Sequence, residues 1–197
     1  MGATDDRTRA VRTRVAFHEA GHALIAAIQD PKSLMSVSMV PTGNLYGSTS
    51  WSGDIGEGTE ADVEALLERV LAGRAAEEIV LGCPSGGAGG SSGSDLAFAT
   101  LIAASAECSW GLGPRLSWLA DVMPDSVATT LASHPGVAQR VENRLQAALE
   151  AAKRTLITHR SALDAIADAL LRRGVLGGDE VWEIVGGKRI STLKVVL

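Results

Sequence analysis

The sequence predicts a mainly α-helical protein with one small β-hairpin. Over most of its 197 residues, apolar side chains recur three or four positions apart, as they do along one face of a helix. One short stretch near residue 40 alternates polar and apolar side chains instead, which is typical of a half-buried strand. A chain of this length with 46% hydrophobic residues can bury one sizeable core or two small ones, and we expect a single domain over residues 1–197.

The N-terminal part is expected to begin with a helix over about residues 7–29. Asp30-Pro31 ends it, because a residue before proline is biased away from helical backbone angles. Ser36 to Pro41 and Leu45 to Trp51 are then the predicted strands of the hairpin, with Thr42-Gly43-Asn44 as the turn between them.

The second and third predicted helices are separated by a loop rich in small residues. Thr59 is the expected N-cap of a helix that ends at Gly82. Ten of the thirteen residues from Gly82 to Ser94 are Gly or Ser, a composition that fits a flexible linker or a mobile loop leading into an active site. Asp95 opens the next helical pattern, which runs to Trp110-Gly111.

The C-terminal part is expected to be helical after a long connection. Residues 111–136 are poorly patterned and hold three of the six prolines, so we expect a surface connection there. Helices are predicted over about 137–159, from a cap at Ser161 onward, and from about Asp179.

These patterns divide the single domain into two parts and a tail. The active-site half covers about residues 7–111, and the C-terminal helical part covers about 137–186. The tail over 187–197 mixes basic and apolar residues and receives no assignment.

Charge and cysteine content exclude several classes of protein. The formal net charge of -5 and the pI near 5.4 leave no basic surface for a phosphate backbone, so no nucleic-acid partner is expected. Cys83 and Cys108 are too few for a disulfide framework, and we expect both to be buried free thiols in a reducing, cytoplasmic location. No apolar run approaches the ~18 residues of a membrane span, so no membrane insertion of this chain is expected.

The segment His18-Glu19-Ala20-Gly21-His22 carries the clearest chemistry in the sequence. At about 3.6 residues per turn, two histidines four apart lie on one face of a helix and can reach a single zinc ion. Glu19 lies beside them, as a general base for water at the ion's open position. Two core or surface histidines without any metal would give the same spacing. Gly21 favours the metal site, because glycine inside a helix costs about 1 kcal/mol relative to alanine and so indicates close packing or room for a ligand.

A zinc site with two histidines needs a third protein ligand. Glu77 and Glu78 lie in the second predicted helix, where thermolysin-like enzymes carry that ligand, and Asp95 lies at the start of the third. Without a metal, Asp95 would be a carboxylate favoured by the helix dipole, and the glutamates a solvated face or ion-pair partners of Arg74. Spacing alone leaves this choice open.

Several segments together resemble one known family. They are His18-Glu19-Ala20-Gly21-His22-Ala23, Val40-Pro41-x-Gly43-x-Leu45-x-Gly47, Leu71-Ala72-Gly73-Arg74-Ala75-Ala76-Glu77-Glu78, Gly93-Ser94-Asp95-Leu96 and Trp110-Gly111. Over about residues 14–186 the chain resembles the peptidase domain of FtsH-type ATP-dependent zinc proteases. The resemblance implies a mainly helical metallopeptidase domain with a small β element, Zn²⁺ as cofactor and endopeptidase activity.

The resemblance also implies roles for individual residues. It gives Asp95 as the third zinc ligand beside His18 and His22. Glu77 and Glu78 would then support the site from behind the ligands or through helix packing.

The expected function is hydrolysis of peptide bonds in unfolded proteins or peptides. In this mechanism Glu19 deprotonates zinc-bound water and later protonates the leaving amine. We expect substrate along the strand edge formed by Val37 to Pro41, because an exposed edge binds an extended peptide through main-chain hydrogen bonds. The alternative is a non-catalytic peptide-binding or protein-binding module that retains the peptidase fold.

Members of this family normally carry a transmembrane segment and an ATPase module ahead of the peptidase domain. The present sequence contains no Gly-x-x-x-x-Gly-Lys-Ser/Thr loop, so we expect a stand-alone peptidase or a fragment. Unfolded polypeptide is the expected substrate. A separate ATPase and further copies of the same chain are the partners that this departure suggests.

Overall fold

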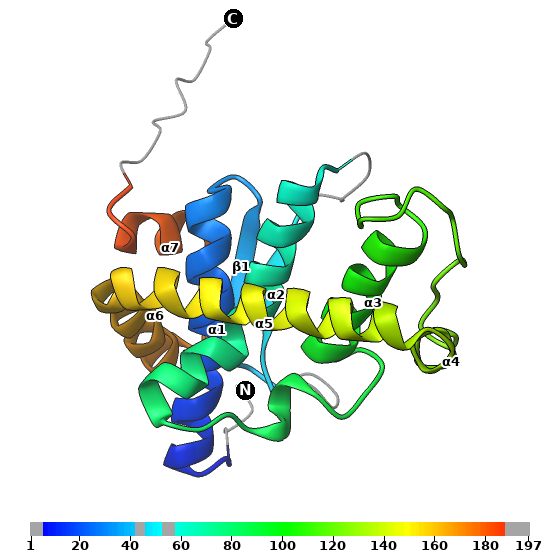
Figure 1. Cartoon of the computed structure of the whole chain (residues 1–197). Coiled ribbons are helices and arrows are strands. Elements are labelled where there is room, and N and C mark those ends of the chain that lie inside the picture. The colour runs from blue at the N-terminus through cyan, green and yellow to red at the C-terminus, as the bar shows by residue number, and fades with distance from the viewer. Residues whose placement is uncertain (1–5, 42–45, 53–57, 188–197) are drawn as a thin grey trace, which may run out of the picture.

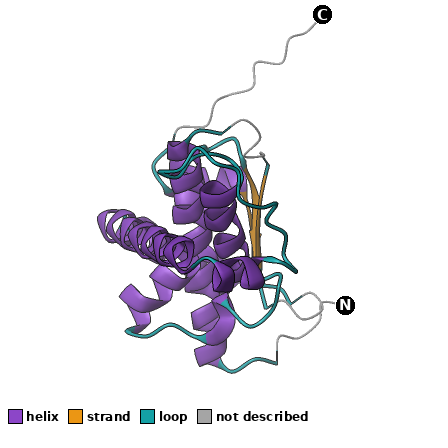
Figure 2. Ribbon diagram, turned by 45° about the vertical axis from the view of Figure 1, so that its right-hand side comes forward, coloured by secondary structure: helices purple, strands orange, loops and turns teal. Residues whose placement is uncertain are grey.

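Helices form the body of the molecule, and three short strands lie along one side of it (Figures 1 and 2). The computed structural model describes residues 6–41, 46–52 and 58–187. Within them the elements are α1 (Arg9–Gln29), β1 (Leu34–Ser38), β2 (Ser48–Trp51), α2 (Glu60–Leu81), the 3-10 turn η1 (Gly86–Ala88), α3 (Asp95–Cys108), α4 (Val127–Ser133), α5 (Pro135–Thr158), α6 (Arg160–Arg173), β3 (Val175–Gly177) and α7 (Gly178–Ile184). The predicted mainly α fold with a small β element is confirmed.

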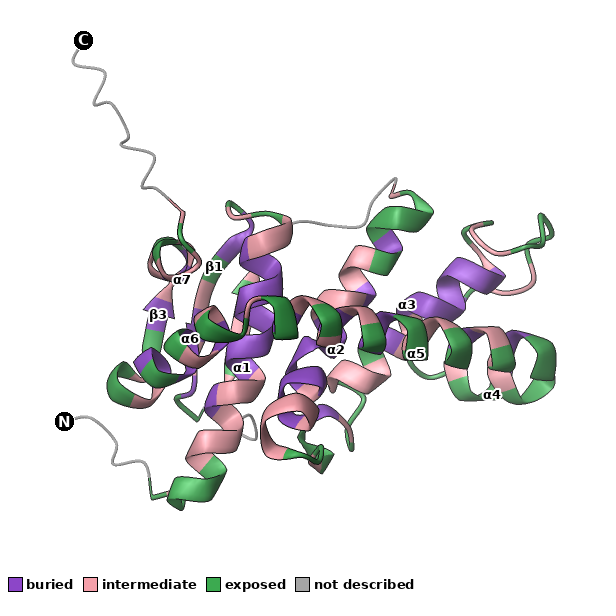
Figure 3. Ribbon diagram, turned by 60° about the vertical axis from the view of Figure 1, so that its left-hand side comes forward, coloured by how far each residue is buried: buried purple, intermediate pink, exposed green. Residues whose placement is uncertain are grey.

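Helix α1 runs through the centre of the core. Every residue from Glu19 to Ala27 is buried, because α2, α6 and the sheet pack around this part of the helix (Figure 3). The backbones of α1 and α2 approach closely at Gly21, where a Cβ atom would lie 2.5 Å from the carbonyl oxygen of Ala72. The histidine motif therefore lies in a helix that the rest of the fold surrounds.

Helix α5 holds α2 and α3 together from the outside. It crosses both helices (Figure 1) and buries an apolar stripe against the core that includes Val141, Leu149 and Leu156. Glu107 of α3, itself buried, accepts hydrogen bonds from two arginines of α5. These contacts fix the position of α3, whose first residue is Asp95.

The sheet has the strand order β2-β1-β3, and both pairings are antiparallel. Val37 of β1 pairs with Thr49 on one side and with Leu176 on the other. The N–H of Met39 donates to the carbonyl oxygen of Gly174 at 2.9 Å. β1 is therefore the middle strand, and the prediction that Val37 to Pro41 forms the exposed edge is wrong. Strand β2 lies at an edge instead, because β3 returns from far along the chain to cover β1.

Other local predictions meet mixed outcomes. Thr59 caps α2, and Gly82 follows α2 with a left-handed backbone (φ 77°), so both predictions are confirmed.

Helix α4 lies within the predicted surface connection, because its apolar residues pack on the core. Helix α6 begins at Arg160, so Ser161 is not its cap. The predicted turn at 42–44 and the tail from 188 onward lie outside the described residues.

The prediction for the two cysteines is half right. Both thiols are free, and Cys108 is buried, but Cys83 is exposed because it follows the end of α2 at the surface. None of the helices in the described part of the chain is long and apolar enough to cross a membrane.

Candidate metal centre

The two histidines of α1 point their outer ring nitrogens at each other across one turn of the helix. The Nε2 atoms of His18 and His22 are 3.2 Å apart, and the ring centroids are 4.9 Å apart. Both residues face α2, with His22 almost fully buried and His18 partly buried.

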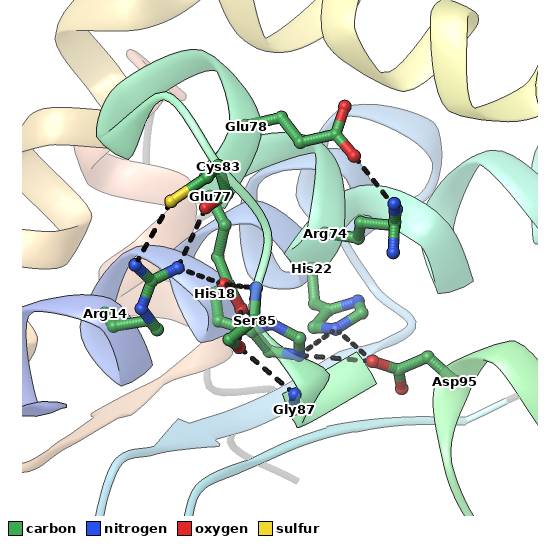
Figure 4. Close-up of polar contacts among 10 residues, drawn as sticks. All are labelled: Arg14, His18, His22, Arg74, Glu77, Glu78, Cys83, Ser85, Gly87 and Asp95. Atoms are coloured by element: carbon green, nitrogen blue, oxygen red, sulfur yellow. Dashed lines mark hydrogen bonds and ion pairs between the residues drawn. The ribbon is translucent and has the colours of Figure 1, made fainter. Parts of the chain in front are cut away.

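Asp95 completes this cluster from the first turn of α3 (Figure 4). Its Oδ2 atom lies 3.1 Å from His18 Nε2 and 3.4 Å from His22 Nε2. The side chain of Ser94 caps α3 by accepting from the N–H of Ala97, so the helix begins at a fixed place. Within the described residues these three side chains are the one group of His, Cys, Asp or Glu residues arranged to hold a metal ion.

The spacing of the three atoms fits zinc. Ligands about 2.0–2.1 Å from a tetrahedral ion lie about 3.3–3.4 Å from one another. The three separations of 3.2, 3.1 and 3.4 Å are close to that value. Two imidazoles and one carboxylate are also a ligand set that zinc accepts while keeping an open position.

Second contacts orient both imidazoles. The Nδ1 atom of His22 donates to the carbonyl oxygen of Arg69 at 2.9 Å, and Nδ1 of His18 lies 2.9 Å from Oε1 of Glu77. A carbonyl and a carboxylate both accept, so both rings carry a proton on Nδ1 and turn Nε2 toward the cluster, the nitrogen through which a neutral imidazole could bind a metal.

Glu77 is a buried carboxylate that ties three segments together behind His18. Its Oε2 atom accepts from Arg14 Nη1 at 2.5 Å and from the backbone N–H of Ser85 at 2.7 Å, and the Ser85 hydroxyl donates to Oε1 at 3.1 Å. Burial alone would raise the pKa of Glu77, but these donors and His18 outweigh it and lower that pKa to about 2. The Gly/Ser loop is thus attached to the site through Ser85 and does not act as a linker between domains.

Glu78, the neighbouring candidate, faces elsewhere. It pairs with Arg74 at 2.9 Å and with Lys153 of α5 at 2.7 Å, and Figure 4 shows it pointing away from the histidines. Its contacts are those of a structural ion pair between α2 and α5.

Gly73 lets α2 pass directly behind the imidazoles. A Cβ atom there would lie 2.5 Å from His22 Nε2 and 2.6 Å from His18 Nε2. Any side chain at this position would occupy the space of the cluster.

Glu19 lies beside the cluster, buried between α1 and β2. Its Oε2 atom accepts from the Thr49 hydroxyl at 2.8 Å, and a Cβ atom on Gly47 would lie 2.5 Å from Oε1. Burial raises the pKa of Glu19, and the nearby His22 and His18 oppose that rise. A carboxylate with a raised pKa can take and return a proton near neutral pH.

In the metal-free protein the carboxylates hold a proton on His18. Burial would lower the pKa of His18, but Asp95 and Glu77 outweigh it and raise that pKa to about 10. Burial would also raise the pKa of Asp95, yet hydrogen bonds with His18 and His22 hold it well below its usual range. A metal ion and this proton therefore compete for His18.

Several residues around the cluster could not be recognised as site residues from the sequence. Gly73 and Gly47 both lie in the motifs quoted above, but nothing in the sequence says that an imidazole or a carboxylate needs their space. Thr49 is an ordinary strand residue in sequence, and Arg69 contributes a main-chain oxygen, which no side-chain pattern can reveal.

Comparisons with known proteins agree with the resemblance. The family model for peptidase family M41 matches residues 7–184. The chain is 37% identical over 187 residues to the ATP-dependent zinc metalloprotease FtsH of Opitutus terrae, covering 91% of this chain and 29% of that protein. It is 33% identical over 187 residues to FtsH 1 of Sorangium cellulosum, with 88% and 30% covered, and 32% identical over 193 residues to the YME1 homolog of Schistosoma mansoni, with 93% and 28% covered. The chain thus spans less than a third of the length of these relatives.

Proposed function

This chain belongs to peptidase family M41 as an FtsH-type peptidase domain, and we propose that it is a zinc-dependent endopeptidase acting on unfolded polypeptides. One observation carries the proposal. Three ligand atoms lie 3.1–3.4 Å apart, as zinc requires, and a buried glutamate lies beside them.

Each residue has a distinct role in the proposed reaction. His18, His22 and Asp95 would hold zinc. When bound there, zinc would supply a Lewis acid that polarises a carbonyl group and makes water more acidic. Glu19 would take a proton from the attacking water and return it to the leaving amine. Thr49 holds Oε2 of Glu19, which leaves Oε1 without a donor among the described residues.

The open edge of β2 is the proposed path of the substrate. The N–H of Ser52, just after β2, donates to the carbonyl oxygen of Ser33, just before β1, at 2.8 Å. The main-chain N–H and C=O groups of successive strand residues point alternately to the two sides of the strand. Those of Thr49 and Trp51 therefore point away from β1, to the open side of β2. An extended peptide paired there would pass next to Glu19, which Thr49 touches.

The test uses an unstructured peptide and zinc-loaded protein. Cleavage should stop when phenanthroline removes the metal and resume when zinc is restored. Methylating the backbone nitrogens of the peptide one at a time should weaken cleavage at every second position near the scissile bond, because only alternate N–H groups face the β2 edge. A native globular protein should resist, since it offers no extended segment until it opens locally.

Other results would contradict parts of the proposal. Sensitivity at no position, or equally at all positions, would reject the β2 edge. Binding of zinc and peptide without any cleavage would favour a non-catalytic binding module. A separate ATPase is a proposed partner, because the relative from Opitutus terrae is named ATP-dependent and this chain spans 29% of it. Further copies of the chain are the second proposed partner.

A further inference from the structure

An arginine and a tryptophan lie next to the metal centre on the β2 side. The ring centroid of Trp51 is 6.4 Å from that of His22, and Cζ of Arg69 lies 5.5 Å from the Trp51 ring. Both side chains are partly buried and partly exposed. Arg69 thus serves His22 with its carbonyl oxygen and extends its guanidinium over the neighbouring indole.

Among the described residues, the guanidinium of Arg69 has one hydrogen-bond acceptor, the side chain of Gln29. Of its five N–H groups, Nε–H donates to Oε1 of Gln29 at 3.0 Å. The charge of Asp30 acts on Arg69, but the Asp30 carboxylate hydrogen-bonds to the N–H of Lys32 instead, and Glu68 accepts from Gln29 and from Thr155. Within residues 6–41, 46–52 and 58–187, no carboxylate lies within ion-pair distance of Arg69.

Strand geometry brings a substrate side chain to this pair. Side chains two apart on a strand share a face, so Trp51 projects to the same side as Thr49, which touches Glu19. On a peptide paired with β2, the residue opposite Trp51 is two positions from the residue opposite Thr49. Its Cβ atom would be about 4.5–5.5 Å from that of Trp51, within reach of the guanidinium.

We propose that Trp51 and Arg69 form a subsite that selects substrates carrying Asp or Glu two residues from the position that faces Thr49, an inference that rests on the proposed peptidase function. The indole would pack against the methylene groups of the acidic side chain. The two Nη groups would meet its carboxylate in the paired geometry that guanidinium favours. The chain as a whole carries a net charge of -5 and would repel an acidic peptide, whereas this subsite would attract an acidic side chain.

Binding can be measured apart from catalysis in the zinc-loaded Glu19→Gln variant. A series of unstructured peptides carries one Glu, or the isosteric Gln, at each position in turn. At a single position the Glu peptide should bind about tenfold more tightly than its Gln partner, which corresponds to ~1.4 kcal/mol. The same position should speed cleavage by the unmodified protein.

Variants of Arg69 assign the preference to this side chain. Arg69→Gln should abolish the difference between Glu and Gln, and Arg69→Glu should favour Lys at that position. Arg160→Gln is the matched control, because Arg160 pairs with Asp164 on α6 and its removal changes net charge equally. It should leave the preference intact. If Arg69→Gln melts at a much lower temperature, Arg69→Lys replaces it and should keep a weakened preference for Glu.

The outcomes separate the two proposals. Cleavage with no Glu preference, or with a preference that survives loss of the Arg69 side chain, overturns the subsite and leaves the peptidase standing. Absence of both binding and cleavage for every peptide overturns the peptidase and the subsite together.

Discussion

Gly73 of α2 lies directly against both imidazoles of the candidate metal centre. A methyl group there would come within 2.6 Å of ring atoms of both His18 and His22. Atoms cannot approach so closely, so the rings would have to move away from the positions that bring their nitrogens toward Asp95. The geometry of the cluster therefore depends on the missing side chain at Gly73 as much as on His18, His22 and Asp95 themselves.

Gly73→Ala should weaken zinc binding at least about tenfold, the lower end of what displaced ligand geometry costs. Competition with a chromophoric chelator measures this directly. Gly86→Ala is the matched control, because a Cβ atom at Gly86 meets nothing within 4 Å. Equal zinc affinity in the two variants would show that the imidazoles do not need the space at Gly73.

Individual site residues differ in how far the sequence could reveal them. His18, Glu19 and His22 follow from helix periodicity, because all three lie within one turn of one element. The choice between Asp95 and the two glutamates depends on distances between α1, α2 and α3, and helical spacing holds no information on these. Spacing offered Asp95 as one candidate, and only the resemblance to a known family favoured it over the glutamates.

Glu77 connects α1, α2 and the Gly/Ser loop at a single buried carboxylate. It accepts from Arg14 and Ser85 and orients His18. Its pKa is about 2 in the folded chain, below the ordinary value of about 4.5. A group with a depressed pKa stabilises the fold above its unfolded pKa, and this contribution is lost as pH falls toward the folded value.

Acid should therefore destabilise the metal-free protein partly through Glu77. Between pH 5 and pH 3 the free energy of unfolding should fall about 2 kcal/mol more in the unmodified chain than in Glu77→Gln. Urea unfolding in the presence of a chelator measures it. Ser85→Ala removes one donor to Glu77 and keeps the backbone N–H. Its free energy of unfolding should therefore fall slightly less between pH 5 and pH 3 than that of the unmodified chain. Identical acid dependence in all three proteins would contradict the role of Glu77.

Elements with strong local patterns were predictable, and those that depend on distant partners were not. Helix α2 begins at its predicted cap and ends at its predicted glycine, because both signals lie in the adjacent sequence. Strand β3 has only three residues and exists because β1 lies beside it. Because β3 was not predicted, β1 was expected to be an edge strand, and the predicted substrate path was therefore placed along β1.

Across the whole molecule, three segments distant in sequence meet at one place. Helix α1 supplies two histidines and a glutamate, α3 supplies Asp95, and β2 holds Glu19 through Thr49. Helix α5 sets the position of α3, so the separation of Asp95 from the histidines depends on the packing of the whole core. In the proposed mechanism this assembly would separate metal binding, by His18, His22 and Asp95, from proton transfer, by Glu19.

The most direct test measures zinc content and peptide hydrolysis side by side in Glu19→Gln. This variant keeps the size of the side chain, so it should retain one zinc per chain while hydrolysis falls by roughly 10²–10⁴-fold. Asp95→Ala is the contrast and should lose both zinc and hydrolysis, whereas Glu78→Ala should lose less zinc. Loss of zinc from Glu19→Gln would make Glu19 a ligand, and full hydrolysis by that variant would remove it as the base; either result would contradict the account.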